Sequence, residues 1–163
     1  MKALLIIDIQ TGLTKRESLY NHNVFFETVN SAIKKYRKLG HRIIFIQHNN
    51  KLLQTETDDW EIDSNLDKHD SDDVIQKKHG NAFQKTELKA LLEKHNIEET
   101  LICGLTSHGC VKYSCIGATE NGFDTYLLIN GHTNLNKDAD VKISTTELEL
   151  VKLGVNLVDV EDL

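Results

Sequence analysis

Residues 100–111 read TLICGLTSHGCV. This stretch joins a short apolar run, 100–103, to a segment in which apolar residues recur with helical spacing, and such a pattern predicts a strand that enters a helix. Cys110 would then lie on the first helical turn. The unpaired N–H groups and the positive end of the helix dipole favour a thiolate over a thiol at that position. Cys110 is therefore a candidate nucleophile.

Strand-like apolar runs recur along the whole chain. Six of them are short and either β-branched or rich in Leu, at 3–7, 42–47, 73–77, 100–104, 125–129 and 155–160. They are continuous rather than alternating, which is expected when both faces of a parallel sheet are covered by helices.

Segments of helical periodicity lie between these runs, and three of them approach a glycine that would end the helix: Gly40, Gly122 or Gly154. Their apolar stripes are Phe25, Phe26, Val29, Ala32, Ile33 and Tyr36; Leu88, Leu91 and Leu92; Val111, Ser114, Cys115 and Ala118; and Leu148 with Val151. The alternation, with right-handed crossovers, predicts an α/β fold with three layers, α/β/α, around a mainly parallel sheet of six strands.

Size and charge restrict the class of protein. A chain of 163 residues suits one domain over 1–163. It carries 25 acidic and 19 basic residues, a net charge of −6, and has no block of Lys or Arg. This composition argues against a broad surface for nucleic acid or an anionic membrane, so the expected partner is a small molecule.

Compartment and thiol state follow from what the sequence contains. The opening apolar run is too short for the core of a signal peptide, and no later run approaches a membrane span, so we expect a cytoplasmic protein. Three cysteines, an odd number, indicate reduced thiols rather than a disulfide framework. Cys103 and Cys115 are expected in the core.

Two charged residues lie at the ends of apolar runs, just as the segment that carries Cys110 follows the run 100–103. Asp8 follows 3–7, and Lys77 follows 73–76, with Lys78 as a competing lysine. A parallel sheet brings its carboxyl ends to one edge, where such sheets bind ligands. We therefore expect Asp8, Lys77 and Cys110 to meet there. The polar segment 49–72 interrupts the alternation, and a loop of this length is usually functional or disordered.

Several short motifs occur in a fixed order along the chain. They are Asp8-x-Gln10, Trp60-Glu61-Ile62, Lys77-x-x-x-Asn81-Ala82-Phe83 followed by Thr86-x-Leu88, the turn 104–111, and Ala118-x-x-x-Gly122. In these motifs the chain resembles the isochorismatase-like cysteine hydrolase superfamily, nearly from end to end. The resemblance implies a Rossmann-like hydrolase that forms a homo-oligomer. It also implies a catalytic triad of Asp8, Lys77 and Cys110, with Lys77 rather than Lys78 selected by its spacing from Phe83, and a cis peptide bond between Leu105 and Thr106.

The same resemblance implies a reaction. Asp8 would take the proton of the Cys110 thiol and return it to the leaving group, while Lys77 stabilises the thiolate and the carboxylate. The sulfur would attack a carbonyl carbon, and the backbone N–H groups of Thr106 and Cys110 would bind the oxyanion. A thioester would form and then be hydrolysed. The expected activity is cleavage of a C–N bond in a small amide.

One departure from the family bears on cofactors. Family members that cleave nicotinamide carry a metal-binding Asp-x-His after the second strand, whereas this chain reads Gln47-His48-Asn49-Asn50. We therefore expect no metal and no other cofactor, and a hydrogen-bonded role for His48. Family members that hydrolyse the vinyl ether of isochorismate lack the cysteine, so Cys110 favours the amidase branch.

Five further residues are candidates for substrate binding by their position in the motifs: Gln10, Trp60, Asn81, Phe83 and His108. Each could instead serve packing or capping, and Gln10 could order the turn beyond Asp8. Two other functions stay open. The chain could be a non-catalytic, small-molecule-binding or regulatory member of the same fold. It could also be a thiol redox protein, although no resolving cysteine is placed for easy pairing with Cys110.

Overall fold

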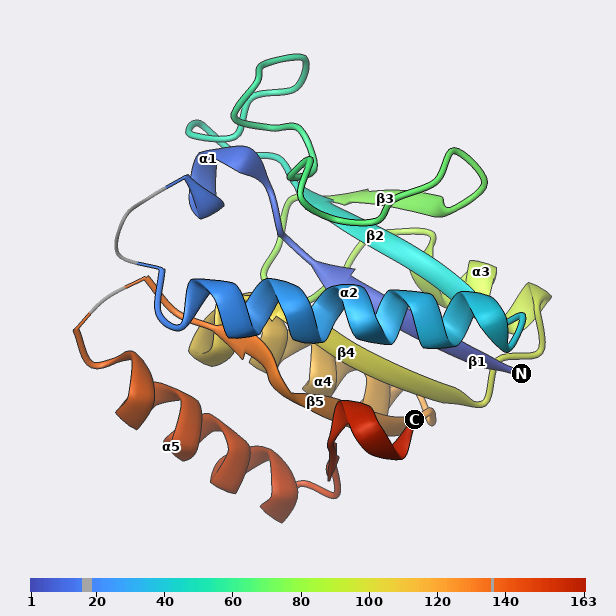
Figure 1. The fold of residues 1–163 in the computed structure, drawn as a ribbon. Helices are drawn as coiled ribbons and strands as arrows, with labels where there is room; N and C mark the ends of the chain where they lie inside the picture. Colours follow the sequence, from blue (N-terminus) through green and yellow to red (C-terminus); the bar gives the residue numbers. More distant parts are fainter. Residues whose placement is uncertain (16–18, 136) are drawn as a thin grey trace.

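Strands and helices alternate along the chain in the computed structural model, which describes residues 1–15, 19–135 and 137–163 (Figure 1). The strands are β1 (Lys2–Ile7), β2 (Arg42–His48), β3 (Asp73–Lys77), β4 (Glu99–Leu105), β5 (Asp124–Thr133) and β6 (Asn156–Val158). The helices are α1 (Thr11–Thr14), α2 (His22–Lys38), α3 (Leu88–Lys94), α4 (Lys112–Glu120) and α5 (Ala139–Lys152), with a π-helical turn over Ser107–Val111 and a 3₁₀ turn over Val160–Asp162.

The six strands form one sheet in the order β3-β2-β1-β4-β5-β6, and every neighbouring pair is parallel. The predicted fold is confirmed, and the sheet is parallel throughout rather than mainly parallel. The predicted strand 155–160 is shorter than expected, because the chain turns into the 3₁₀ turn at Val160. β5 runs four residues beyond the predicted end at 129.

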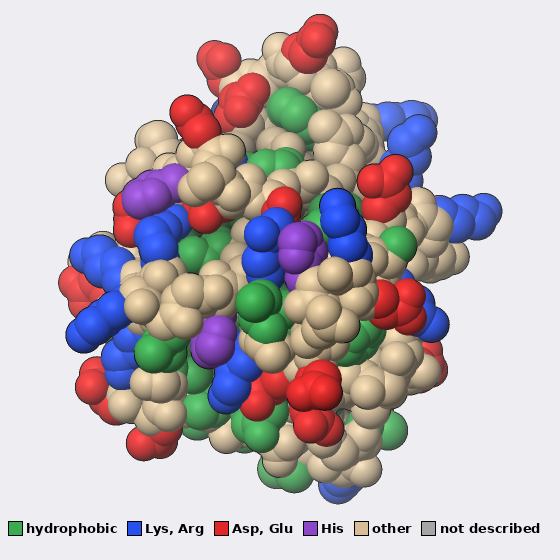
Figure 2. Space-filling model, turned by 90° about the vertical axis from the view of Figure 1, so that its right-hand side faces the viewer, with side chains coloured by type: hydrophobic (Ala, Val, Ile, Leu, Met, Phe, Trp, Pro, Cys, Tyr) green, Lys and Arg blue, Asp and Glu red, His purple; other side chains and the backbone are tan. Residues whose placement is uncertain are grey.

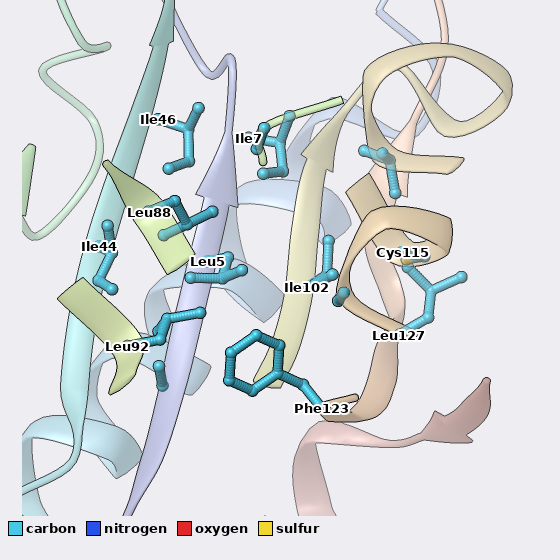
Figure 3. Close-up of a cluster of buried hydrophobic side chains, with 14 of the residues drawn as sticks. Leu5, Ile7, Ile44, Ile46, Leu88, Leu92, Ile102, Cys115, Phe123 and Leu127 are labelled. Atoms are coloured by element: carbon cyan, nitrogen blue, oxygen red, sulfur yellow. The ribbon is translucent and has the colours of Figure 1, made fainter. Parts of the chain in front are cut away.

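Two apolar cores fill the space on either side of the sheet. α2 crosses the front of the sheet in Figure 1 and buries Phe25, Val29 and Ile33 against residues such as Leu4 and Phe45. On the opposite face, Leu88 and Leu92 of α3 lie over Leu5, Ile44 and Ile46, while Cys115 of α4 lies near Ile102 and Leu127 (Figure 3). Each large side chain that is removed from water stabilises the fold by about 1.5–3 kcal/mol.

The predicted helical stripes hold for α2, α3 and α4, but the prediction for α5 is wrong. Leu148 and Val151 are 65% and 49% exposed, and the buried face of α5 instead carries Thr146 and Leu150. α5 packs beside α4 and the edge of the sheet, so only a narrow strip of it is covered. The exposed apolar residues of α5 are compatible with the expected homo-oligomer, which stays a prediction.

The segment 49–72 folds back over the carboxyl end of β1. The backbone N–H groups of Thr11 and Gly12 donate to the carbonyl oxygens of Glu61 and Asp59, both at 2.9 Å. Arg37 of α2 forms ion pairs with Asp67 at 3.0 Å and Asp72 at 2.8 Å. The two hydrogen bonds hold the loop beside the edge at which the predicted catalytic residues end their strands, whereas the ion pairs hold its last residues near the start of β3.

Gly104 lets β1 and β4 approach each other at that edge. It has a φ of +125°, and an added Cβ would lie 2.1 Å from the carbonyl oxygen of Ile7. Gly104→Ala is therefore expected to lower the free energy of unfolding by about 3 kcal/mol or more, since it combines a strained φ with a clash against backbone. Urea denaturation checks this value.

Gly122→Ala is the matched control for this measurement. Gly122 also has a positive φ, +86°, but an added Cβ would meet nothing within 4 Å. A loss of about 1 kcal/mol is expected there from conformation alone. Equal losses in the two variants would contradict the close approach of Gly104 to β1.

No helix of the described residues is long and apolar enough to cross a membrane. On the face shown in Figure 2, Lys and Arg side chains are interspersed with Asp and Glu, and hydrophobic side chains form small separate patches.

Candidate active site

Asp8, Lys77 and Cys110 meet at the carboxyl edge of the sheet. Asp8 follows β1 directly, Lys77 is the last residue of β3, and Cys110 lies in the π-helical turn that follows β4. The Lys77 ammonium donates to Asp8 Oδ2 at 2.8 Å and to Cys110 Sγ at 3.3 Å. Lys78, the competing lysine, is exposed. The structure therefore brings together the three residues that the sequence singled out.

The ion pair at the centre of the site is almost fully buried. Asp8 is 2% exposed and Lys77 is 1% exposed. Charges at such burial are tolerated only when they are paired and hydrogen-bonded, because desolvation of an isolated ion is costly. The second carboxylate oxygen, Asp8 Oδ1, is buried and has no hydrogen-bond partner among the described residues. It is therefore free to accept a proton.

His48 is a third partner of Lys77. Its Nδ1 lies 2.6 Å from Lys77 Nζ and 3.9 Å from Asp8 Oδ2. The register of β2 against β3 places His48 opposite Lys77. The sequence indicated a hydrogen-bonded role for His48 but not its partner. The register of two parallel strands joined by a long loop cannot be predicted from the sequence of either strand.

The resting thiol differs from the expectation. Burial, and next the charge of Asp8, raise the pKa of Cys110 to about 11, and Lys77 offsets only part of this. The predicted preference for a thiolate is therefore wrong. Cys110 does not open a regular helix: the turn is interrupted at Gly109, with φ −113° and ψ −116°, and α4 begins at Lys112. Cys110 therefore does not lie on the first turn of a continuous helix, where the helix dipole would stabilise a thiolate.

Burial also changes the two neighbours of the thiol. Desolvation raises the pKa of Asp8 above its usual range, against the opposing effect of Lys77. Burial, and next the charge of Lys77, lower the pKa of His48, so the imidazole is neutral at neutral pH. The resting site is thus a thiol beside a carboxylate of increased basicity, with the only formal positive charge of the group on Lys77.

The turn that carries Cys110 is held from β5 and the residues just beyond it. The Leu105–Thr106 peptide bond is cis. The carbonyl oxygen of Thr106 accepts from the N–H groups of Gly109 at 3.0 Å and Val111 at 3.2 Å. Ser107 Oγ bonds to His132 Nδ1 at 2.8 Å. These contacts hold the backbone of Thr106 and Cys110 beside the pocket.

A pocket of about 130 Å³ opens onto the sulfur. It is lined by Asp8, Leu13, His48, Asn50, Leu53, Leu105, Thr106 and Cys110. Three leucines thus line the pocket together with Asp8 and Cys110, and the pocket is far smaller than the 300–1,000 Å³ that is common for drug-sized ligands. The geometry suits a small neutral molecule with an apolar part.

The five residues predicted to bind substrate are not among those that line this pocket. Gln10 is fully buried and bonds to backbone, and the indole N–H of Trp60 donates to Asn49 Oδ1. Asn81 Oδ1 accepts from the N–H of Phe83 at 2.9 Å, and Phe83 packs against Phe123 with ring centroids 5.9 Å apart. His108 Nδ1 lies 2.5 Å from Asn134 Oδ1.

Leu13, Asn50 and Leu53 line the pocket and were not singled out from the sequence. Two of them lie in the segment 49–72, whose length indicated a functional or disordered loop. The sequence contains no further signal for them, because which loop side chains turn inward depends on the path of the loop.

The site contains atoms of the kind that bind metals. One ligand atom each of Asp8, His48 and Cys110 lies within 4.8 Å of the others. However, Lys77 Nζ bonds to all three residues, so a cation already occupies the point on which they converge. A divalent ion would meet strong repulsion from that ammonium at contact distance. The donor set therefore does not fit a resident metal while Lys77 is charged.

The sequence matches the isochorismatase domain over residues 2–162. The chain belongs to the isochorismatase family. It is 28% identical over 132 residues to YrdC, an uncharacterized isochorismatase family protein of Bacillus subtilis, covering 78% of this chain and 71% of YrdC. It is 35% identical over 77 residues to the nicotinamidase of Saccharomyces cerevisiae, covering 47% of this chain and 35% of that protein. A crystal structure of an isochorismatase family protein superposes with a TM-score of 0.90 at 28% identity, covering 96% of this chain and 97% of that one.

Proposed function

We propose that this isochorismatase family protein is a cysteine hydrolase that cleaves the C–N bond of a small amide through a thioester. Family membership supports hydrolase activity in general. The observation that carries the finer proposal is the contact of one buried ammonium, that of Lys77, with both a carboxylate and a thiol at the mouth of a pocket.

The first half of the reaction forms the thioester. Cys110 Sγ bonds to the amide carbon as its proton passes to Asp8, which suits a thiol with a pKa of about 11 because no free thiolate has to build up first. The negative charge that develops on the carbonyl oxygen is bound by the backbone N–H groups of Thr106 and Cys110, and each such donor is worth about 3–4 kcal/mol. Asp8 then protonates the nitrogen, the C–N bond breaks, and ammonia or an amine leaves.

The second half restores the enzyme. A water molecule gives a proton to Asp8 and attacks the thioester carbon, and the resulting oxyanion uses the same two N–H groups. The C–S bond breaks, the carboxylic acid leaves, and the proton returns to the sulfur. The raised pKa of Asp8 suits both steps, since a carboxylate of increased basicity accepts a proton more readily. Lys77 keeps the carboxylate and the sulfur in place throughout.

An acyl adduct on Cys110 tests this function. The protein is mixed with a panel of small amides, quenched in acid and measured by mass spectrometry, and an adduct on Cys110 is expected that is absent from Cys110→Ala. Cys115→Ala is the control, because Cys115 is a buried core thiol and its loss should leave the adduct intact. Absence of both adduct and turnover across the panel would instead favour a non-catalytic binding member of the family.

Pocket size predicts the preferred substrate. We expect short aliphatic amides to react best, because Leu13, Leu53 and Leu105 limit the space beside the sulfur. Leu53→Ala is expected to change the preference for chain length, measured as kcat/KM for an amide with two extra methylene groups divided by kcat/KM for the short amide. This ratio should be higher in the variant than in the wild type, by about 10- to 200-fold for each methylene group that does not fit the wild-type pocket. Steady-state kinetics on an amide series checks this.

Leu52→Ala is the control for the amide series. Leu52 is the neighbour of Leu53 in the same loop, and its side chain is 69% exposed. The preference for chain length should be unchanged in this variant. A shift of the same size as in Leu53→Ala would mean that Leu53 does not bound the acyl site.

A further inference from the structure

The contact between His48 and Lys77 has no part in the proton transfers described above. Lys77 Nζ has three N–H donors, and within the described part of the chain it bonds to three acceptors: Asp8 Oδ2, Cys110 Sγ and His48 Nδ1. An ammonium that is 1% exposed loses water on all sides, so a donor without a partner would be costly. His48 therefore completes the set of acceptors around this cation.

This contact fixes the protonation state of the imidazole. Because the ammonium donates to Nδ1, that nitrogen must carry the lone pair, and the single ring proton lies on Nε2. The ionisable groups that face His48 are Lys77 from β3, Asp8 after β1, Cys110 from the π-helical turn, and His79 after β3. A second proton on the ring would place two cations 2.6 Å apart.

The main chain of His48 is held from two sides by one side chain. Gln10 Oε1 accepts from the N–H of His48 at 2.8 Å, and Gln10 Nε2 donates to the carbonyl oxygen of His48 at 3.1 Å. The same Nε2 group donates to the carbonyl oxygen of Trp60 at 2.8 Å. Since Gln10 is fully buried, these bonds fix the position of the His48 backbone, and with it the base of the His48 side chain, relative to β1.

We propose that His48 is a positioning residue of this site: its neutral imidazole, held by Gln10, directs the Lys77 ammonium onto Asp8 and Cys110, and protonation of His48 disrupts the arrangement. The proposal rests on the proposed function for its kinetic consequences only. As the pH falls, His48 gains a proton and repels Lys77, and Asp8 separately gains a proton and ceases to act as a base. Two protonations therefore remove activity on the acid side.

The kinetic test compares two substitutions. His48→Gln offers an amide oxygen to Lys77 but cannot titrate, so at mildly alkaline pH its kcat is expected to exceed that of His48→Leu about 10-fold or more. His48→Leu removes the acceptor, and kcat is expected to fall about 10- to 100-fold, as for loss of one hydrogen bond to a buried charge. On the acid side, log(kcat/KM) of the wild type should fall with a limiting slope of two, and that of His48→Gln with a slope of one.

His79→Gln is the matched control, since His79 lies near His48 but the structure shows no hydrogen bond from it to Lys77. Its slope should remain two. A slope of two in His48→Gln, or an unchanged kcat in His48→Leu, would overturn the proposal.

A second measurement does not need a substrate. Long-range ¹H–¹⁵N correlation spectra of the histidine rings, with His48 assigned from the signals missing in His48→Gln, should show the Nε2–H tautomer at neutral pH. They should also show that the His48 ring gains its second proton only below the usual range for histidine. An Nδ1–H tautomer, or titration at or above the ordinary pKa, would overturn the role of His48 even if amide hydrolysis is found. The expected tautomer without any amide turnover would leave the role of His48 standing and reject the proposed function.

Discussion

In the Asp8→Asn variant, amide turnover is expected to fall by about 10²- to 10⁴-fold, the usual contribution of a general acid–base group, while alkylation of Cys110 becomes faster. Turnover falls because the amide of asparagine cannot take the proton of the thiol or return one to the leaving nitrogen. Alkylation accelerates because the charge of Asp8 is one of the causes that raise the pKa of Cys110, and Lys77 then acts on the sulfur unopposed.

The two effects are measured on the same protein. Hydrolysis is followed by release of ammonia, and alkylation by mass spectrometry after iodoacetamide treatment at neutral pH. Since the pKa of wild-type Cys110 is about 11, its alkylation rate should rise with pH across the neutral and mildly alkaline range. Asp73→Asn is a matched control, because Asp73 lies at the opposite end of β3 from Lys77. A parallel loss of turnover and alkylation in Asp8→Asn would show that the variant is misfolded or that Asp8 does not act on the sulfur.

In the Lys77→Met variant, turnover is expected to be lost together with about 3–5 kcal/mol of stability, the typical cost of removing one partner of a buried ion pair. Methionine fills similar space but leaves the Asp8 carboxylate buried without its counter-ion. Alkylation of Cys110 should become slower, because Lys77 is the group that lowers the pKa of the thiol. The alkylation rate therefore changes in opposite directions in Lys77→Met and Asp8→Asn.

The stability loss should depend on pH with a defined sign. Without Lys77, the folded-state pKa of Asp8 lies still further above the value of the unfolded chain, so the variant is penalised once the pH exceeds the unfolded value of about 3.9 and the penalty grows as the pH rises toward the folded value. Urea denaturation at acidic and at neutral pH should show the smaller loss in acid. Lys78→Met is the control, because Lys78 is the next residue in the chain, carries the same charge as Lys77 and is exposed. An equal loss in Lys78→Met would remove the special role of Lys77.

The sheet was predictable from sequence because its strands are buried on both faces and therefore appear as uninterrupted apolar runs. α2 was equally predictable, since six apolar residues on one stripe are all buried. α5 was not, because its stripe competes with a second one through Thr146 and Leu150, and only the position of the neighbouring elements decides which face is covered. Local periodicity gives the helix but not its orientation when both faces are partly apolar.

The candidate site likewise has features that the sequence predicts and features that depend on how the elements pack. Asp8, Lys77 and Cys110 could be proposed together because parallel strands bring their ends to one edge. The partner of His48 and the inward positions of Leu13 and Leu53 depend on strand register and on the course of a long loop, which no short motif records. The pKa of Cys110 depends on burial and on the balance of two opposite charges, so a position near a helix start was not sufficient to predict it.

The strand order has a consequence for how the chain acquires its activity during synthesis. β1 is central and pairs with β2 and β4, yet β4 ends only at Leu105. Translation delivers the amino-terminal half first, so Asp8 and Lys77 can join before Cys110 leaves the ribosome. Until then β1 presents an unpaired apolar edge, which is a template for aggregation. A nascent chain halted before β4 should therefore need a chaperone to remain dispersed, and Asp8, Lys77 and Cys110 come together only when the second half of the sheet docks.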